Sequence, residues 1–512
     1  MKKLFVAAAT LGCSLMLAAC GSTPPATGPG PVDAGSRLSA GGFILEGRKN
    51  FSSNRVTLPQ PTAGQMPARL GAQALTSPLL EWTGPQLFGY SIADIGVNAG
   101  GDLFLGQSAF GMYWDDANRT LPPHLLKFTS TGQKLALQRF PFGTQGGSNA
   151  VLVTEDGAKE EVYHLIDPRE PYSEGPQAEI YGTDMQRLSN GSEEQFSLPI
   201  QGFPSEVVPA KQGIATLQIL RPEQGGAGGV DVRELAYRSW GEIGLTQHYV
   251  LRSPAALKDG TVRAHLASAS DGSLYLLTSV DIPNEECHSF RSHYFSTLAC
   301  PSVMGVTKFV DGEAAWQVYW ESSSPQLALD LSASVQGVSI LMTSGHARGE
   351  PSATSAQTVL SFGPDGSVKG NITLPIQQLR SQLEIPDKPG LADTERVVSA
   401  PLNLTQDNEG HLLAYSDNLI LTGTVMDGFV HHYLMDSNGV ETAVPLPAER
   451  GSINKVVMRG EYVYAIGTTN NKFGSPQPPL LNSPDDLNRS TVQEKTFLLP
   501  LDFQLRSRSG RS

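Results

Sequence analysis

The chain has 512 residues, of which 53 are glycine and 36 are proline, and only 17% are charged. This composition argues against a protein built from long helices and favours many short strands joined by tight turns. The formal net charge of -13 argues against a nucleic-acid partner, because binding phosphates requires a basic surface.

The N-terminus has the features of an export signal. Lys2 and Lys3 precede an apolar stretch from Leu4 to Leu15, and Leu17-Ala18-Ala19-Cys20 follows. The apolar stretch is shorter than the roughly 20 residues that span a bilayer, and it matches a signal-peptide core. This order of residues resembles the lipobox signal of bacterial lipoproteins. The resemblance implies cleavage before Cys20 and acylation of its thiol; an ordinary secretory signal with an incidental cysteine is the alternative.

The resemblance also implies where the mature protein is located. Loss of Lys2 and Lys3 with the signal peptide lowers the formal charge from -13 to -15. Several acyl chains would hold the protein in membrane lipid, on the periplasmic or cell-surface side. Gly21 follows the cysteine, so the enterobacterial signal for inner-membrane retention, an Asp, is not present. We therefore expect a signal peptide (1–19), a lipidated flexible tether (20–37), an N-terminal extension (38–76), a folded body (77–506) and a disordered tail (507–512).

The body repeats a unit of four short strands. In the first unit, extended runs flank a turn at Gly100-Gly101 and a second turn at Ser130-Thr131-Gly132. Alternating residues around glycine-centred turns are typical of β-hairpins. Glycines equivalent to Gly101 recur at intervals of 50 to 73 residues, at Gly157, Gly213, Gly272, Gly337, Gly410 and Gly460.

This rhythm resembles a β-propeller, which implies an all-β fold of seven four-stranded antiparallel blades. The Trp-Asp rhythm of WD40 repeats, the kelch glycine pair and a full sialidase Asp box are not found, and a β-helix or stacked sandwiches are the structural alternatives. The seventh unit lacks its second turn glycine. We expect residues 77–83 to complete it by pairing antiparallel with residues 496–502, which would remove an exposed sheet edge.

Two cysteines remain in the mature chain, Cys287 and Cys300. In an oxidising compartment they should form a disulfide, which would contribute roughly 3 kcal/mol on the chain-entropy model. A metal site that includes His288 and His293 is the alternative. The twelve residues between the cysteines do not match the close pairs of zinc sites.

Nearly all long insertions fall on one predicted face of the propeller. They lie between the second and third strands of a unit or between units, at 106–123, 167–177, 221–229, 282–302, 345–356, 376–397 and 469–495. Long loops on one face of a rigid scaffold usually carry binding sites. Two insertions combine aromatic and charged residues, and they supply the candidate binding face: Phe110, Tyr113, Trp114, Asp115, Asp116, His288, Phe290, Arg291 and Tyr294. These aromatics could instead fold back over the rim of the propeller.

A second set of polar residues occurs near the first turn of each unit. It lies seven or eight residues before the turn glycine and comprises Asp94, Asn149, Glu206, His265, Asp330 and Asn403. We call this set the polar ring, because first strands line the central channel of a propeller. Its carboxylates and amides could hold a cation, and waters that fill a polar channel are the alternative. No other cofactor is indicated.

Two functions are compatible with these patterns. The first is a lipoprotein that binds or scaffolds a cell-envelope protein or glycan through the long loops. The second is an exported propeller enzyme, a glycan lyase or hydrolase, with a pocket at the channel mouth. Common catalytic motifs are not found, which favours the first hypothesis, although the fold alone does not decide.

Overall fold

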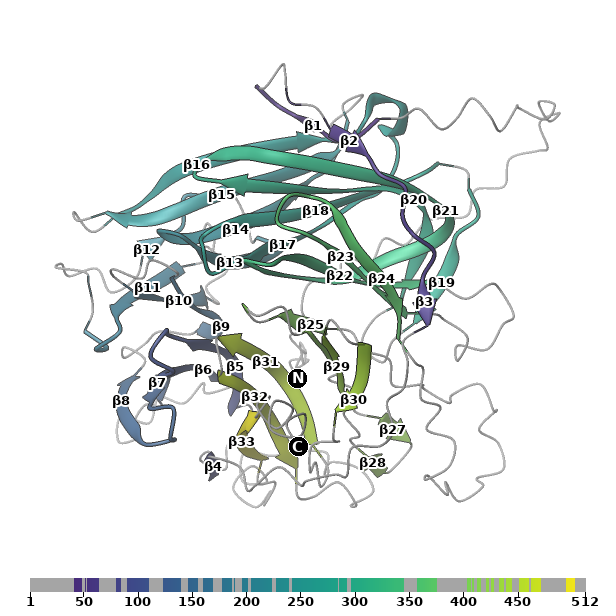
Figure 1. Cartoon of the computed structure of the whole chain (residues 1–512). Coiled ribbons are helices and arrows are strands. Elements are labelled where there is room, and N and C mark those ends of the chain that lie inside the picture. The colour runs from purple at the N-terminus through teal and green to yellow at the C-terminus, as the bar shows by residue number, and fades with distance from the viewer. Residues whose placement is uncertain are drawn as a thin grey trace, which may run out of the picture. The chain divides into compact units, whose positions relative to one another are not determined.

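The computed structural model shows an all-β chain (Figure 1). Within the residues that the structure describes, no helix is long and apolar enough to cross a membrane. The described residues are 41–47, 51, 53–63, 80–83, 90–109, 123–139, 146–154, 160–168, 177–186, 188, 196–200, 204–222, 227–238, 242–283, 285–291, 296–344, 357–374, 403–406, 408, 412–415, 420–422, 425–427, 432–436, 439–443, 451–459, 462–470 and 494–501.

The first three units are antiparallel sheets whose strands follow one another along the chain, as the turn pattern predicted. The first contains β5 (Tyr90–Val97), β6 (Leu103–Ala109), β7 (Pro123–Phe128) and β8 (Lys134–Arg139). The second contains β9 (Gly146–Val153), β10 (Glu161–Pro168), β11 (Gln177–Gly182) and β12 (Phe196–Ser197). The third contains β13 (Glu206–Ala210), β14 (Gly213–Leu220), β15 (Gly229–Arg238) and β16 (Glu242–Arg252).

The fourth and fifth units share one strand, β21 (Glu313–Ser334), so they form a continuous sheet. Its first half pairs with β20, and from Gln326 onward it pairs with β22. A 3-10 turn (Ala255–Leu257) precedes the fourth unit. The fourth unit contains β17 (Val262–Ser268), β18 (Leu274–Asp281) and β20 (Ser296–Val310), and β19 (His288–Arg291) pairs with β20. The fifth contains β22 (Gly337–Ser344), β23 (Gln357–Phe362) and β24 (Val368–Thr373).

The remaining strands form two further four-stranded sheets and one hairpin. The sixth unit contains β25 (Asn403–Gln406), β26 (Leu412–Tyr415), β29 (His432–Asp436) and β30 (Gly439–Ala443). A hairpin of β27 (Ile420–Thr422) and β28 (Val425–Asp427) lies between β26 and β29 in sequence. The seventh unit contains β31 (Gly451–Arg459), β32 (Tyr462–Asn470), β33 (Glu494–Leu501) and β4 (Leu80–Thr83).

The predicted pairing that closes the seventh unit is confirmed for residues 80–83, while residues 77–79 lie outside the described residues. Strand β4 pairs antiparallel with β33, and Leu80 lies opposite Leu498 while Thr83 lies opposite Lys495. A segment from the N-terminal side of the body therefore supplies the fourth strand of the last unit. The outer edge of β33 is covered as expected.

Turn glycines have the backbone conformation that their role requires. Gly213 and Gly337 have φ of +109° and +128°. A Cβ atom would lie 2.1 Å from the carbonyl oxygen of Leu235 at the first position and 2.0 Å from that of Phe362 at the second. These turns therefore need glycine both for the positive φ and for the close approach of a neighbouring strand.

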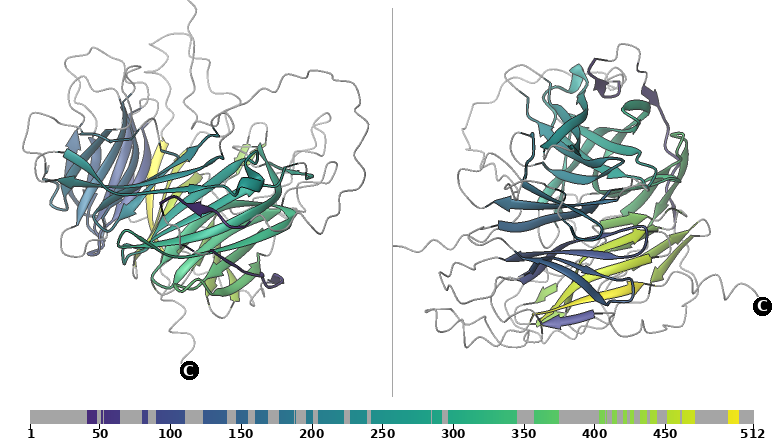
Figure 2. Two further views of the ribbon diagram at one scale, coloured as in Figure 1. Left: turned by 90° about the horizontal axis from the view of Figure 1, so that it is seen from above. Right: turned by 90° about the vertical axis from the view of Figure 1, so that its left-hand side faces the viewer.

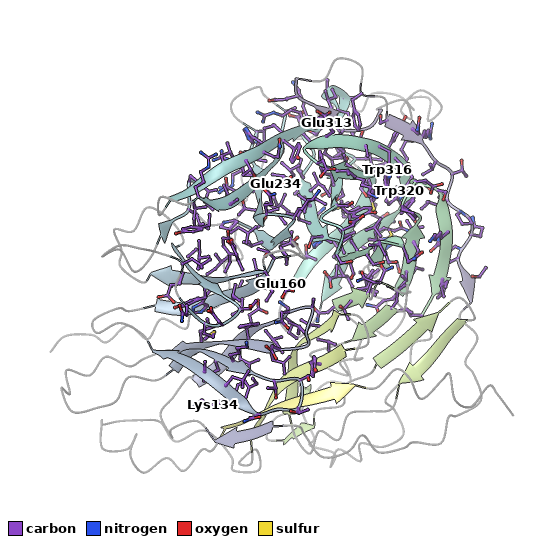
Figure 3. The ribbon with its side chains drawn as sticks, turned by 60° about the vertical axis from the view of Figure 1, so that its left-hand side comes forward. Lys134, Glu160, Glu234, Glu313, Trp316 and Trp320 are labelled. Atoms are coloured by element: carbon purple, nitrogen blue, oxygen red, sulfur yellow. A yellow bond between two sulfur atoms is a disulfide. The ribbon has the colours of Figure 1, made fainter. Side chains whose placement is uncertain are left out.

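The apolar core lies between neighbouring units. One cluster joins Leu276 and Phe309 of the fourth unit to Tyr249 of the third. Another contains Trp320, which lies on β21 (Figure 3). Its ring centroid is 5.5 Å from that of Phe362 in the fifth unit. Further clusters connect the seventh unit to the first, the first to the second, the second to the third and the fifth to the sixth. Each interior sheet thus packs on both of its faces.

The N-terminal extension contributes three short strands that the sequence did not predict. Strand β1 (Ile44–Leu45) pairs antiparallel with β16, whereas β2 (Ser53–Arg55) and β3 (Thr62–Ala63) pair in parallel with β21 and β24. They appear in purple along the edges of the teal and green sheets (Figures 1 and 2). We call residues 41–63 the strap, because they cover edges of the third, fourth and fifth units in turn.

Side chains of the strap enter the core between these units. Phe43 and Leu45 are buried in the cluster between the third and fourth units. Val56 and Leu58 pack against the cluster between the fourth and fifth units. Arg55 also pairs with Glu321, with Nη2 and Oε2 3.1 Å apart. The strap is therefore part of the folded body and differs in this respect from a flexible tether.

Candidate functional site

Two polar-ring residues, Asp94 and Asp330, follow a β-bulge in the first strand of their unit. In β5, Ile92 pairs with Gln107 and Asp94 with Gly106, so Ala93 has no partner of its own. The same irregularity precedes Asp330 in β21 and Lys455 in β31. In β9, Asn149 is the extra residue itself. A bulge redirects the side chain beside it, and here it directs charged groups toward the neighbouring sheet.

Asp94 connects three units. It is buried, and its Oδ2 accepts a hydrogen bond from the main-chain N–H of Val151 in β9, at 2.9 Å. Its Oδ1 forms an ion pair with the Nζ of Lys455 in β31. One carboxylate therefore joins the first unit to both the second and the seventh. A count of seven residues back from Gly460 reaches Ile453 and misses Lys455. Only two residues separate Arg459 from its partner Tyr462, whereas five separate Val97 from Leu103 in the first unit.

Glu206 connects the third unit to the fourth. Its Oε2 accepts a hydrogen bond from the main-chain N–H of Leu266, at 2.6 Å, and its Oε1 lies 2.7 Å from Nδ1 of His265. The main chain of Ala328, in the first strand of the fifth unit, also favours the charged form of His265. The contact between Glu206 and His265 thus joins the third unit to the fourth.

Asp330 continues this series into the sixth unit. Its Oδ2 accepts a hydrogen bond from the main-chain N–H of Leu404, at 2.6 Å, and its Oδ1 accepts one from Leu331, at 2.8 Å. Asn403, the other ring residue here, begins β25 beside Leu404 and is half-buried. Asn149 lies on β9, and its side chain is outside the described residues.

The electrostatics of this cluster follow from its geometry. Burial opposes the charged form of His265, but the carboxylates of Glu206 and Asp330 outweigh it and raise the pKa of His265 to about 9. Burial raises the pKa of Asp330 to about 6, although its hydrogen bond with Leu404 and the charge of His265 act in the opposite direction. The cluster therefore contains a protonated histidine between two acidic groups at neutral pH.

The described ring residues join neighbouring sheets. The three carboxylates proposed as cation ligands accept hydrogen bonds from main-chain N–H groups, and Lys455 and His265 supply positive charge beside them. Among the described residues, no three His, Cys, Asp or Glu side chains are grouped so that they could hold a metal ion. The observed contacts hold neighbouring sheets together. This structural role of the polar ring involves neither a bound cation nor water in the channel.

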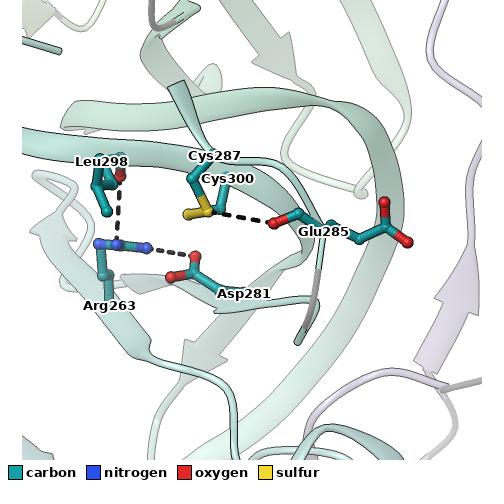
Figure 4. Close-up of a disulfide and its surroundings, with 6 residues drawn as sticks. All are labelled: Arg263, Asp281, Glu285, Cys287, Leu298 and Cys300. Carbon is teal, nitrogen blue, oxygen red and sulfur yellow. Dashed lines mark hydrogen bonds and ion pairs between the residues drawn. A yellow bond between two sulfur atoms is a disulfide. The ribbon is translucent and has the colours of Figure 1, made fainter. Parts of the chain in front are cut away.

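The disulfide between Cys287 and Cys300 is present (Figure 4). The segment 282–302, expected to be a long loop, is largely a β-hairpin instead. Strand β19 pairs with β20 from His288 opposite Ala299 to Arg291 opposite Ser296. The expectation failed because β20 begins at Ser296, whereas its pairing with β18 begins only at Ser302; the earlier residues of β20 pair with β19.

An ion pair supports the base of this hairpin. Arg263 of β17 pairs with Asp281, and its Nη2 donates a hydrogen bond to the carbonyl oxygen of Leu298, at 3.3 Å (Figure 4). Burial raises the pKa of Asp281, and the guanidinium of Arg263 partly offsets this effect. The side chain of Leu298 is 50% exposed. The disulfide, the β-ladder and Arg263 thus stiffen one insertion, which we call the stapled hairpin (residues 285–300).

Most candidate residues of the binding face cannot be placed. His288 is half-buried at the start of β19, while Phe290 and Arg291 lie on β19 with side chains outside the described residues. The other candidates lie outside the described ranges: Phe110, Tyr113, Trp114, Asp115, Asp116 and Tyr294. The joint binding face of the two insertions therefore remains a prediction.

A buried polar group between the first and second units was not anticipated. His164 and Glu179 are fully buried, with Nδ1 and Oε2 3.3 Å apart, and Tyr181 donates a hydrogen bond to the same Oε2, at 2.8 Å. The sequence contained one feature that could have predicted this pair. His164 occupies a core-facing position of β10, and Glu179 of β11 lies opposite it. Nearby, Glu160 accepts a hydrogen bond from the main-chain N–H of Ala99, which links the two units at their turns (Figure 3).

Comparison with known proteins gives likenesses of structure alone. No family model matches the chain, and no curated protein matches it in sequence. The Dos1 propeller is similar at 9% identity and a TM-score of 0.40, over 76% of this chain and 91% of that chain. Prolyl oligopeptidase B from Galerina marginata is similar at 10% identity and a TM-score of 0.40, over 77% of this chain and 50% of that chain.

A polysaccharide lyase, the ulvan lyase PL25, is similar at 12% identity and a TM-score of 0.30, over 65% of this chain and 82% of that chain. At these identities and TM-scores the likenesses assign no activity, ligand or partner to this chain. The chain is an all-β protein of antiparallel sheets, and propeller proteins are among its structural neighbours.

Proposed function

We propose that this protein is a membrane-anchored lipoprotein of the cell envelope whose body is a seven-bladed β-propeller. The body would act as a binding or scaffolding module for an envelope protein or glycan. Cys20 would carry the acyl chains, as the lipobox implies, and the long insertions would form the binding face.

The succession of packed sheets supports the propeller. Apolar clusters join the seventh unit to the first, and then each unit to the next as far as the sixth. The polar ring follows the same order, because Lys455 and Asp94 join the seventh, first and second units. A β-propeller repeats four-stranded sheets around a central channel. In this chain a strand from the other end of the body would close the ring.

The observation that carries the binding role is the stapled hairpin. Its backbone is held by the β19–β20 ladder and by the disulfide, while Arg263 holds the carbonyl oxygen of Leu298. An insertion whose base is held in this way loses less conformational entropy when a partner binds, which is the benefit of preorganisation. Aromatic residues such as Phe290 occur in this hairpin, and aromatic side chains often dominate binding energy.

The test is recovery of a partner from envelope extracts by the purified protein. Replacing Tyr113, Trp114, Phe290 and Tyr294 with Ala should abolish recovery and leave the free energy of unfolding nearly unchanged. The matched control is Leu135→Ala, which alters a 48% exposed apolar residue of the first unit and should retain the partner.

Two outcomes would contradict the proposal. A loss of several kcal/mol of stability in the aromatic variant would show that these side chains pack on the body. Release of new ends from envelope glycans by the purified protein would instead support the alternative of a lyase or hydrolase. In that case the loops would contribute substrate contacts to an enzyme.

A further inference from the structure

The stapled hairpin has one edge that the described strands leave open. Among the described residues, β19 pairs with β20 alone, from His288 opposite Ala299 to Arg291 opposite Ser296. Strand β20 itself continues into the sheet of the fourth unit, where it pairs with β18 and β21. The outer edge of β19 is therefore the place where a further strand could join the hairpin.

The disulfide shows which pairs of the hairpin exchange main-chain hydrogen bonds. The register that places His288 opposite Ala299 also places Cys287 opposite Cys300, and the Cα atoms of the two cysteines are 4.3 Å apart. In an antiparallel ladder, pairs without mutual hydrogen bonds are about 4.5 Å apart, whereas hydrogen-bonded pairs are about 5.5 Å apart. The cysteine pair therefore belongs to the first kind.

The two kinds of pair alternate along a ladder, so Ser289 and Arg291 belong to the same kind as Cys287. Their main-chain N–H and C=O groups then point away from β20, toward the open edge. A separate contact agrees with this assignment. Ser289 lies opposite Leu298, whose carbonyl oxygen accepts a hydrogen bond from Nη2 of Arg263 on the other side of β20, at 3.3 Å (Figure 4). The carbonyl of Leu298 thus points away from β19, as the assignment requires.

An extended polypeptide fits such an edge. It repeats N–H and C=O groups at the spacing of a neighbouring strand, whereas the hydroxyl groups of a glycan have no such repeat. This chain covers edges of its own sheets in the same way, because β1, β2, β3 and β4 each pair with a sheet formed by distant residues. Three of these strands have only two or three residues, so a short segment is sufficient.

The charges beside this edge favour a basic segment. Glu285 and Glu286 directly precede Cys287, and both are exposed. The whole chain also has a formal net charge of -13. A segment that ran antiparallel to β19 would place its C-terminal end beside the two glutamates. Basic residues at that end would complement their charge.

We propose that the outer edge of β19 binds an extended polypeptide segment of the partner by β-strand addition. The segment carries basic residues at the end next to Glu285 and Glu286. This inference rests on the proposed function of the stapled hairpin as part of the binding face, and it specifies a protein as the partner in place of a glycan. The disulfide and Arg263 hold the base of the hairpin, so the edge is ordered before binding.

The first experiment measures amide hydrogen exchange, resolved by residue, in the purified full-length protein in detergent. The probe is a synthetic peptide of alternating threonine and valine that ends in two lysines. In the free protein, the amides of Ser289 and Arg291 should exchange faster than those of His288 and Phe290, which bond to β20. The peptide should slow the exchange of Ser289 and Arg291. The same peptide, N-methylated along its backbone, should have no effect.

The second experiment changes the edge itself. Ser289→Pro removes an outward N–H and places a ring at the edge, a position at which strands tolerate proline. This variant should bind the peptide about tenfold more weakly, because a main-chain hydrogen bond is lost. Ser289→Ala is the matched control and should bind like wild type. Unchanged exchange at His288 and Phe290 in both variants would show that the hairpin is intact.

Several outcomes would overturn the inference. Unchanged exchange at millimolar peptide, or slow exchange of Ser289 and Arg291 in the free monomer, would show that the edge does not accept a strand. Equal binding of the N-methylated peptide would show that main-chain hydrogen bonds are not used. Protection that depends on protein concentration alone would assign the edge to a second copy of this chain.

Partner recovery separates this inference from the proposed function. Equal recovery of an envelope partner by wild type and by Ser289→Pro would overturn the strand addition and leave the proposed function standing. Peptide binding at the edge, without recovery of any partner, would support the strand addition and contradict the proposed function alone.

Discussion

The carboxylate of Asp330 accepts a hydrogen bond from the main-chain N–H of Leu404, 2.6 Å away, although 74 residues separate them along the chain. Asp94 and Val151 repeat this relationship across 57 residues, and Glu206 and Leu266 repeat it across 60. In each case a carboxylate of one first strand binds the backbone of the first strand in the following unit. The contact is therefore a recurring joint between neighbouring sheets.

Removing one such joint should destabilise the body measurably. Asp330→Ala leaves the N–H groups of Leu404 and Leu331 without this acceptor, and we expect a loss of about 1–3 kcal/mol in the free energy of unfolding. Urea unfolding measures the loss. Glu46→Ala is the control, because this carboxylate is 50% exposed and pairs with Arg252 on the surface. A similar loss in both variants would contradict the special role of Asp330.

Glu234 should make the free energy of unfolding depend on pH in the direction opposite to a carboxylate whose pKa is lowered on folding. Burial raises its pKa, the hydrogen bond from Tyr249 at 2.9 Å lowers it, and the charge of Asp311 raises it. Because the folded pKa exceeds the unfolded pKa, this group adds stability as the pH falls through its folded value.

Glu234→Gln removes that titration and keeps an oxygen that can accept from Tyr249. Relative to wild type, the variant should be more stable at about pH 7 than at about pH 4. Thermal unfolding at the two pH values provides the measurement, and a stability difference that does not vary with pH would contradict the raised pKa of Glu234.

The disulfide should stabilise the protein through its closed loop and through the hairpin that it holds. Replacing both Cys287 and Cys300 with Ser should lower the free energy of unfolding by about 3 kcal/mol. Adding reductant to wild type should reproduce most of this loss and should have no effect on the double variant. Unchanged unfolding of wild type in reductant, with the thiols shown to be free, would contradict the prediction.

The strap offers a test with adjacent residues. Phe43 is 3% exposed in the core between the third and fourth units, whereas Ile44 next to it is 56% exposed. Phe43→Ala should cost about 3–5 kcal/mol because a large buried ring is removed. Ile44→Ala should change stability by less than about 0.5 kcal/mol. Equal effects, measured by chemical unfolding, would show that the strap does not contribute to the core in this way.

Lipidation is tested by fractionation of cells that produce the protein with Cys20→Ser. The variant should appear as unprocessed or soluble material, because the lipobox needs the thiol for acylation and for cleavage. Wild type should sediment with membranes and be released by detergent. Equal membrane retention with unchanged processing of the variant would contradict acylation at Cys20.

Local sequence signals predicted many of the strands and turns of the body. Gly101, Gly213, Gly272 and Gly337 occur in tight turns with positive φ, as their spacing predicted. The closing strand was predicted from an unused extended segment and an incomplete last unit, and the cysteine pair was predicted from the count. Turn conformation and disulfide formation depend on the identity of a few residues. A short stretch of sequence is therefore enough to predict them.

The joints and the strap depended on the tertiary structure. Counting from a turn glycine did not identify Lys455 as the partner of Asp94, because the turn between Arg459 and Tyr462 is shorter than the turn between Val97 and Leu103. Strands β1 to β3 have only two or three residues each, too few for an alternating pattern. They form because the edges of other sheets are available for pairing and apolar clusters between those sheets accept their side chains. The sequence of the segment alone does not specify those edges and clusters.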